Sequence, residues 1–433
     1  MKAIGSRIRF IHALHNRPFA LVWIGQAISS LGDGAYNTAL AWFILLLTGS
    51  ATAMGIVVTA SAIPRILFLL FGGVVADRLP RRLVMLWSDT GRAIVVLLIA
   101  TLAWLQLLQL WHLVVLSLIF GFVDGFFIPA YQSIPPQLVP GKDLPSANAL
   151  NELSQHGSQL LGPLLGAACV ALVGPASAFG LDGLTFVASA FCLLFMYPPA
   201  KRQAQINNPS SEATELPEKA KPASTWSPRS IFKDMGEGLK YVISSTWIWV
   251  TIVVSALGNI VLVAPLVVAM PKLIHDAYHT GVWLLGAIGA ASATGAILAV
   301  LIVGQLKQIR WRGIKAYLSL VGSSLALIII GIPLPQGSEA VIAIGAGVIL
   351  GFGFGFFNVI WFIVLQQMIP ADKLGRVSSI DMMGSLCLTP VGYVVGGILT
   401  DHIGPRLVFV VCGILAILLH LAALTVRGIR QLD

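Results

Sequence analysis

Long apolar stretches recur along almost the whole chain, separated by short clusters of glycine, proline and charged residues. Each stretch is close to the roughly 20 residues that an α-helix needs to cross a bilayer. Six spans are predicted in the first half, at residues 18–47, 52–76, 83–106, 111–134, 146–172 and 177–197. Six more follow a polar interval, at residues 242–270, 281–305, 314–333, 339–368, 377–399 and 405–427. The pattern predicts an all-α polytopic membrane protein with twelve transmembrane helices in two six-helix bundles.

The polar interval divides the chain into an N-terminal bundle (1–197), a cytoplasmic linker (198–241) and a C-terminal bundle (242–433). Residues 198–230 are rich in proline, serine, alanine and mixed charge, which is typical of a flexible linker. The last part of the linker carries apolar residues at every fourth position, which favours a short interfacial helix before the seventh span. Two halves with equal numbers of spans suit alternating access, because each half can rock as a rigid body about a site between them.

Composition and charge support this assignment. Hydrophobic residues make up 57% of the chain and charged residues only 10%, which excludes an ordinary soluble domain. Nearly all of the 27 lysines and arginines fall in the termini and in alternate connections, whereas the opposite face carries only Lys272 and Arg406. By the positive-inside rule, we expect a multi-pass protein of the plasma (inner) membrane with both termini cytoplasmic and an uncleaved first helix. The net charge of +9 then reflects topology, and no nucleic-acid partner is implied.

The turn after the second span, residues 73–82, reads GVVADRLPRR. It resembles the G-x-x-x-D-R-x-G-R-R signature of the major facilitator superfamily, with Pro80 at the usual glycine position. The resemblance implies a cytoplasmic latch in which Asp77 holds the two halves together in the outward-facing state while the arginines pair locally. Asp89 and Arg92, spaced i,i+3 in the third span, can extend this network. The predicted latch comprises Gly73, Asp77, Arg78, Arg81, Arg82, Asp89 and Arg92.

A simpler interpretation exists for part of this motif. Arg81 and Arg82 are equally well explained by the positive-inside rule alone. Asp77 gains nothing from that rule, so it carries the functional hypothesis.

Four further stretches are similar to the drug, macrolide and siderophore (enterobactin) exporter branch of the superfamily. They are Gln26 to Gly34, Asn148 to Leu150 with Gly162-Pro163, Asp182 with Phe186 and Ser189, and Leu365 to Ser379. Residues 72–84 (GGVVADRLPRRLV) also align without gaps with residues 396–408 (GGILTDHIGPRLV). Spans 2 and 11 run in opposite directions, so inverted repeats would make these segments equivalent, although chance similarity between two apolar turns is the alternative.

Three charged residues are predicted near the middle of the membrane: Asp33 in the first span, Arg65 in the second and Asp124 in the fourth. A charge at this depth costs several kcal/mol unless it has a partner, a wet cavity or a function. We therefore expect Asp33 or Asp124 to take up a proton on one side and release it after the conformational change, with Arg65 as the ionic partner. The alternative is a static ion pair between Arg65 and an aspartate that only joins the spans.

Polar residues at helical spacing predict the wall of a central cavity. Gln26, Ser30, Asp33 and Asn37 share one face of the first span, and Asn148, Glu152, Gln155 and Gln159 share one face of the fifth. Glu152 and Asp182, closer to span ends, favour structural roles. The candidate substrate-cavity residues are Gln26, Asn37, Phe127, Tyr131, Gln155, Asn259, Asn358 and Trp361. For each aromatic residue, ordinary packing is the competing explanation.

The leading functional hypothesis is proton-coupled export of small amphiphilic molecules, with protons as the coupling ion and a monomeric carrier. A lysophospholipid or lipid flippase and a solute importer on the same fold remain alternatives. The chain has no Walker phosphate loop, so ATP is not expected to be the direct energy source. A membrane-embedded enzyme acting on lipid is not indicated, because no HExxH or GxSxG motif appears. The four cysteines lie within apolar runs without metal-ligand spacing, so neither a metal nor a cofactor is predicted.

Overall fold

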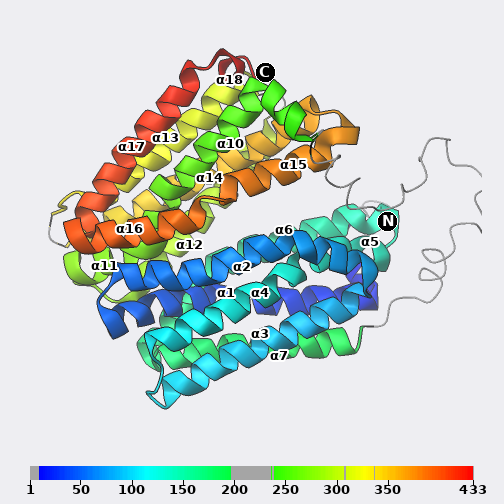
Figure 1. Ribbon diagram of the computed structural model, residues 1–433, viewed down its shortest axis with the longest axis horizontal. Coiled ribbons are helices and arrows are strands. Elements are labelled where there is room, and N and C mark those ends of the chain that lie inside the picture. The colour runs from blue at the N-terminus through cyan, green and yellow to red at the C-terminus, as the bar shows by residue number, and fades with distance from the viewer. Residues whose placement is uncertain (1–8, 197–235, 237, 307–308, 336, 433) are drawn as a thin grey trace, which may run out of the picture.

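The computed structural model describes residues 9–196, 236, 238–306, 309–335 and 337–432, and every regular element in these ranges is helical. Figure 1 shows two bundles lying one above the other, blue to green for the first half and green to red for the second. The first bundle consists of α1 (Arg17–Thr48), α2 (Ala51–Arg78), α3 (Arg81–Trp104), α4 (Leu110–Ser133), α6 (Leu144–Leu172) and α7 (Pro175–Leu194). Three short helices, η1 (Arg9–His15), α5 (Pro135–Leu138) and η2 (Gly141–Asp143), lie at the ends of these spans.

The second bundle begins with a long seventh span, in which α10 (Thr246–Gly258) continues through the π-helical turns η3 (Asn259–Val263) and η4 (Pro265–Ala269). The span then ends with α11 (Met270–Lys272) and η5 (Leu273–Ala277). The span extends beyond the predicted end at residue 270, because the chain stays helical through Lys272, His275 and Asp276 as far as Ala277. The remaining spans are α12 (Val282–Gln305), α13 (Arg312–Gly331), α14 (Glu339–Met368), α15 (Ala371–Leu386) with α16 (Thr389–Ile403), and α17 (Pro405–Thr425), followed by α18 (Arg427–Arg430).

The prediction of twelve helical spans in two six-helix bundles is confirmed. Ten segments in the described part of the chain are long and apolar enough to cross a membrane. Helices α1 and α6 are also long enough, but their polar side chains place them outside that set. These two helices supply most of the polar wall of the central cavity described below, so their polarity reflects the site and not a shorter topology.

Several sequence expectations concern the linker at residues 198–241. Residues 197–235 and 237 lie outside the described residues, so the linker itself stays a prediction. Residues 238–244 are helical and lead directly to the break before α10. Leu239 on this helix is half exposed, in keeping with an interfacial position.

The two bundles meet along two helix pairs, α2 with α16 and α6 with α12. Small residues allow the backbones to approach closely at both pairs. A Cβ atom added at Gly55 of α2 would lie 2.3 Å from the carbonyl oxygen of Tyr393, and one at Gly286 of α12 would lie 2.7 Å from that of Pro163. Close backbone approach through small residues is how membrane helices gain packing energy where lipid supplies no hydrophobic driving force.

The bundles diverge towards the side on which both termini lie, as Figure 1 shows. At the opposite side they share an apolar cluster, in which Trp42 and Leu45 of α1 pack with Met270, Leu273 and Ile274 of the seventh span. The α1–α2 turn at this side is short, because Gly49 adopts a φ of 63° and the side chain of Ser50 accepts a hydrogen bond from the backbone of α2. The structure is therefore closed at one end and parted at the other.

Gly351 makes the closest helix contact in the second bundle and provides a test of its packing. A Cβ atom at this position would lie 1.7 Å from the carbonyl oxygen of Ser292, whereas one at Gly345 of the same helix would meet no atom within 4 Å. We expect Gly351→Ala to lower the free energy of unfolding by about 1–3 kcal/mol through overpacking. Gly345→Ala should be neutral or slightly stabilising, because alanine favours a helix more than glycine does. Thermal unfolding in detergent measures both variants, and equal melting temperatures would contradict this packing.

Candidate functional site

A cavity of about 1240 Å³ lies between the two bundles. The first bundle contributes α1, α6 and Met54 of α2, and the second contributes the seventh span, α12 and α14. Along α6 the lining extends from Pro163 back to Glu152, and along α14 it extends from Gly351 to Gln366. Because the chain crosses alternately, the start of α6 and the end of α14 lie on the same side as the termini. The cavity therefore extends towards the side on which the bundles part.

The two walls of the cavity differ in chemistry. On the first bundle, α1 presents Ser30, Asp33 and Asn37, and α6 presents residues of the same kind, namely Glu152, Gln155, His156, Ser158 and Gln159. The second bundle presents mainly apolar groups, which include Leu266, Val267, Leu285, Val300, Phe354, Val359, Phe362 and Ile363, with the polar Ser292, Asn358 and Gln366 among them. A site with one polar and one apolar wall suits an amphiphilic molecule of small size.

The sequence-predicted cavity residues separate into two groups. Asp33, Asn37, Gln155 and Asn358 line the cavity. The other five lie outside the lining: Gln26, Phe127, Tyr131, Asn259 and Trp361. Each polar group in this second set has a partner within the helix packing, so its polarity serves the fold.

These partners are specific. Gln26 is buried and donates its amide to Ser189 Oγ at 2.9 Å, although it shares a helix face with Asp33. The Tyr131 hydroxyl donates a hydrogen bond to Asn151 Oδ1, the Asn259 amide donates to the backbone oxygen of Ser385, and the Trp361 indole donates to Asp381. Phe127 lies under the guanidinium of Arg92, whose central carbon is 4.0 Å from the ring centroid. A sequence pattern identifies the face of a helix but not the point at which the cavity ends along it.

The centre of the first bundle holds a buried charge cluster around Arg92. Its guanidinium pairs with Asp89 on the same helix and with Asp124 Oδ1 of α4 at 3.2 Å. Asp89 also accepts a hydrogen bond from Ser189 Oγ of α7 at 2.6 Å. Arg65 Nη1 of α2 lies 3.9 Å from Asp124 Oδ2, but its side chain is half exposed. The cluster joins α2, α3, α4 and α7 in one electrostatic unit.

Asp89 and Arg92, which were predicted to extend the latch network, both belong to this cluster. The i,i+3 pair is present, it lies halfway along α3, and Arg92 also contacts Asp124 of α4. Asp33 on the cavity wall interacts electrostatically with Arg92, Asp124, Asp89 and Arg65. The predicted coupling residues Asp33, Arg65 and Asp124 thus belong to one network, with Arg92 at its centre. Sequence reasoning missed Arg92 as the central cation, because its spacing from Asp89 suggested a local pair.

Asp182 of α7 lies next to this network and is fully buried. Its Oδ1 accepts a hydrogen bond from Thr185 Oγ1 at 3.3 Å, and its Oδ2 has no hydrogen-bond partner among the described residues. A Cβ atom at Gly32 would lie 2.5 Å from Oδ1, so α1 passes close to this carboxyl beside Asp33. The sequence placed Asp182 near a span end, whereas the structure places it in the interior.

The predicted latch turn is described only in part. Gly73, Asp77 and Arg78 lie in the last turns of α2, and their side chains are outside the described residues. Arg81 donates to the carbonyl oxygen of Ser133 at the end of α4, at 2.5 Å. Arg82 donates to the carbonyl oxygens of Leu193 and Leu194 at the end of α7, at 2.8 and 2.5 Å. Both arginines thus satisfy carbonyl groups at the C-terminal end of a neighbouring helix, where a cation is favoured.

Two six-helix bundles around a central cavity define a membrane carrier of the two-bundle type. The sequence matches the family model of the Major Facilitator Superfamily over residues 22–388. The chain belongs to this superfamily, and it is a transporter and not an enzyme.

Two relatives that are named as efflux proteins agree with the exporter branch that the sequence motifs indicated. The chain is 26% identical to the multidrug efflux pump Tap of Mycolicibacterium fortuitum, covering 96% of this chain and 97% of the relative. It is 21% identical to macrolide efflux protein A of Streptococcus pyogenes, with coverage of 96% and 97%. It is also 26% identical to an uncharacterised MFS-type transporter, YfiS, of Bacillus subtilis strain 168, with coverage of 94% and 92%.

Solved structures support the fold. The nucleoside transporter NupG superimposes with a TM-score of 0.70 at 15% identity, covering 94% of this chain and 98% of NupG. The xylose transporter XylE from E. coli, in an inward-open conformation, superimposes with a TM-score of 0.67 at 12% identity, covering 94% and 96%. At these identities the likeness concerns the architecture alone.

Proposed function

We propose that the protein exports small amphiphilic compounds from the cytoplasm by alternating access, in exchange for protons, as a monomer in the plasma (inner) membrane. The observation that carries this proposal is the central cavity, which has an acidic, polar wall on the first bundle and an apolar wall on the second. An amphiphilic molecule can place its polar part on α1 and α6 and its apolar part on α12 and α14. The efflux activity named for two of the relatives supports export.

The proposed orientation places both termini in the cytoplasm, on the basis of the positive-inside rule. In this orientation the cavity of about 1240 Å³ faces the cytoplasm, and the closed end faces outwards. This is the state in which an exporter loads its substrate. Rocking of the two bundles about the α2–α16 and α6–α12 contacts would then expose the cavity to the outside.

Proton coupling is assigned to Asp33 together with the Arg92 cluster. Asp33 is the carboxylate that both lines the cavity and interacts with Arg92, Asp124 and Asp89. Protonation of Asp33 removes one negative charge from a network that holds two arginines, so the network differs in charge between the loaded and unloaded states. A proton can drive the cycle only if the two conformations differ in their affinity for it, and exposure of Asp33 to alternate sides supplies that difference.

Transport into inverted membrane vesicles tests the proposal. Vesicles with an acidic lumen expose the cytoplasmic face and should accumulate radiolabelled erythromycin, a macrolide, when they contain the protein. Accumulation should cease when nigericin collapses the pH gradient, and it should be absent in vesicles without the protein. Accumulation of erythromycin that does not depend on the pH gradient would overturn proton coupling. Substrate movement only out of the vesicles would indicate an importer, and transfer of a fluorescent lysophospholipid between leaflets without macrolide transport would indicate a flippase.

A further inference from the structure

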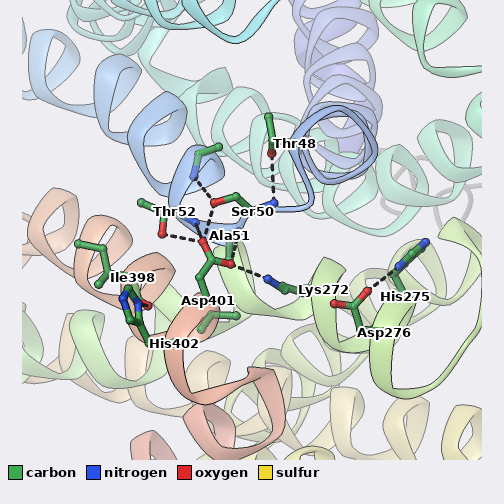
Figure 2. A network of polar contacts seen from close by, with 12 residues as sticks. Thr48, Ser50, Ala51, Thr52, Lys272, His275, Asp276, Ile398, Asp401 and His402 are labelled. Carbon is green, nitrogen blue, oxygen red and sulfur yellow. Dashed lines mark hydrogen bonds and ion pairs between the residues drawn. The ribbon is translucent and has the colours of Figure 1, made fainter.

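A dense polar contact joins the two bundles at the closed end of the molecule, and it centres on Asp401 in the last turn of α16 (Figure 2). The carboxylate accepts hydrogen bonds from the backbone amides of Ala51 and Thr52, each at 2.9 Å. It also accepts hydrogen bonds from the hydroxyl groups of Ser50 at 2.5 Å and Thr52 at 2.7 Å. The four donors belong to the N-cap residue Ser50 and to the first turn of α2, in the other bundle.

The position of this carboxylate is favourable for two electrostatic reasons. The first backbone amides of a helix have no partner within the helix, and together they form its positive end, so an anion placed there is stabilised. In addition, Lys272 Nζ of the seventh span lies 2.6 Å from Asp401 Oδ1. Asp401 is therefore held between the positive end of α2 and a lysine. Its side chain is only 20% exposed and that of Lys272 only 16%, so water screens the contact little.

The contact lies where the two backbones touch. A Cβ atom at Gly397, one turn before Asp401, would lie 2.6 Å from the carbonyl oxygen of Ala51. Separation of α16 from α2 at this end would break the four hydrogen bonds to Asp401 together. The ion pair with Lys272 would remain, because both residues belong to the second bundle.

The internal sequence repeat relates Asp401 to Asp77 at the other end of α2. In the alignment of residues 72–84 with residues 396–408, Asp401 takes the place of Asp77. The aligned arginines are Arg82 and Arg406, and they make equivalent contacts: Arg82 donates to the carbonyl oxygen of Leu193, and Arg406 donates to that of Ala277 at 3.1 Å. Each accepting carbonyl lies at the C-terminal end of a neighbouring span. The similarity thus extends from the sequence to the contacts, which chance resemblance would not require.

We propose that Asp401 is an outer latch, which holds α2 to α16 while the cavity faces the side of the termini and releases α2 when the cavity opens to the opposite side. It is the inverted counterpart of the Asp77 turn. The latch rests on the alternating-access part of the proposed function, but it does not depend on the substrate or on proton coupling.

Accessibility of the closed end tests the latch. Ala41 of α1 lines the outer part of the cavity and is buried. A cysteine at this position, in a variant whose own four cysteines are replaced by serine, can be labelled in whole cells by a membrane-impermeant maleimide only when the outer side opens. Asp401→Asn keeps the size of the side chain but removes its charge. We expect it to raise the labelling rate about tenfold or more, since hydrogen bonds to a charged group stabilise more than neutral ones.

A matched control lies nearby. Asp276, on the same side of the molecule, pairs with its neighbour His275 at 2.7 Å, within the seventh span and not across the bundles (Figure 2). Asp276→Asn should leave the labelling rate unchanged. Lys272→Gln should leave the labelling rate close to that of wild type, because its ion pair with Asp401 lies within the second bundle in both conformations. If Asp401→Asn does not yield a monodisperse protein, Thr52→Val, which removes one of the hydroxyl donors to Asp401 from the first turn of α2, decides by the same measurement and should raise the labelling rate by a smaller factor.

An unchanged labelling rate in folded Asp401→Asn would overturn the latch, and so would an equal increase in Asp276→Asn. The labelling experiment needs neither substrate nor a pH gradient. A wild-type protein that fails to transport erythromycin, combined with faster labelling of Asp401→Asn, would therefore contradict the proposed function while leaving the latch in place.

Discussion

Replacing Asp33 by asparagine is expected to abolish the pH-gradient-driven accumulation of erythromycin in inverted vesicles while leaving binding of erythromycin to the protein intact. Asparagine retains the size and the hydrogen-bonding capacity of the side chain, but it can neither take up nor release a proton. Asp33 is the cavity carboxylate that interacts with the Arg92 cluster. We therefore expect the pH gradient to act on the conformation of the protein through protonation of Asp33. Exchange of labelled for unlabelled substrate across the membrane, which needs no net proton movement, should persist.

The control for this prediction is Glu152→Gln, which makes the same chemical change on the same cavity wall. The Glu152 side chain is 75% exposed, and it lies 3.8 Å from His156 on its own helix. We expect this variant to retain gradient-driven accumulation. If Asp33→Asn still accumulates erythromycin in response to the gradient, or if Glu152→Gln loses accumulation to the same extent, the role assigned to Asp33 is wrong.

The largest loss of stability is expected for Arg92→Met. Methionine has a similar length but no charge, so Asp89 and Asp124 would be left in the bundle interior without their central cation. Removal of one partner from a buried ionic group costs about 3–5 kcal/mol, because the remaining charge is uncompensated. The contact of Arg92 with the rings of Phe127 and Phe186 adds to this loss. We expect a strongly reduced melting temperature and a reduced yield of monodisperse protein.

Arg65→Met is the matched control, because Arg65 faces the same Asp124 from 3.9 Å with a half-exposed side chain. Exposed ion pairs contribute about 0–1 kcal/mol, so this variant should be close to wild type in stability. A triple variant, Arg92→Met with Asp89→Asn and Asp124→Asn, should recover part of the stability, since it also removes the uncompensated charges. Equal melting temperatures for Arg92→Met and Arg65→Met would show that the cluster does not stabilise the bundle in this way.

The number of spans and their approximate bounds were predictable because a bilayer imposes one dominant pattern, an apolar run of fixed length. The two spans of lower hydropathy, α1 and α6, were also predicted from their apolar stretches, and their polar residues recur on one helix face. The same periodicity placed Asp33, Asn37 and Gln155 on the cavity wall. It could not separate Asn37 from Gln26, because both share a face and only the depth of the cavity distinguishes them.

Pairing between distant helices was less accessible. The i,i+3 spacing of Asp89 and Arg92 suggested a local pair, but nothing in the sequence showed that Asp124, from another helix, would share the same guanidinium. The Asp401 contact illustrates the same limit, because its donors are backbone amides, which every residue carries. An internal repeat marked its position but not its partner.

Helix α2 connects the two ends of the carrier. Its first turn is bound by Asp401, and its last turns contain Asp77 of the predicted cytoplasmic latch. With 28 residues it is about 42 Å long, close to the full thickness of a membrane. With the proposed latch at Asp401 and the predicted latch at Asp77, one end of α2 is bound to the second bundle in each conformation. Overstabilising either end would then lengthen one half of the cycle, so the fastest turnover requires two latches of matched and moderate strength.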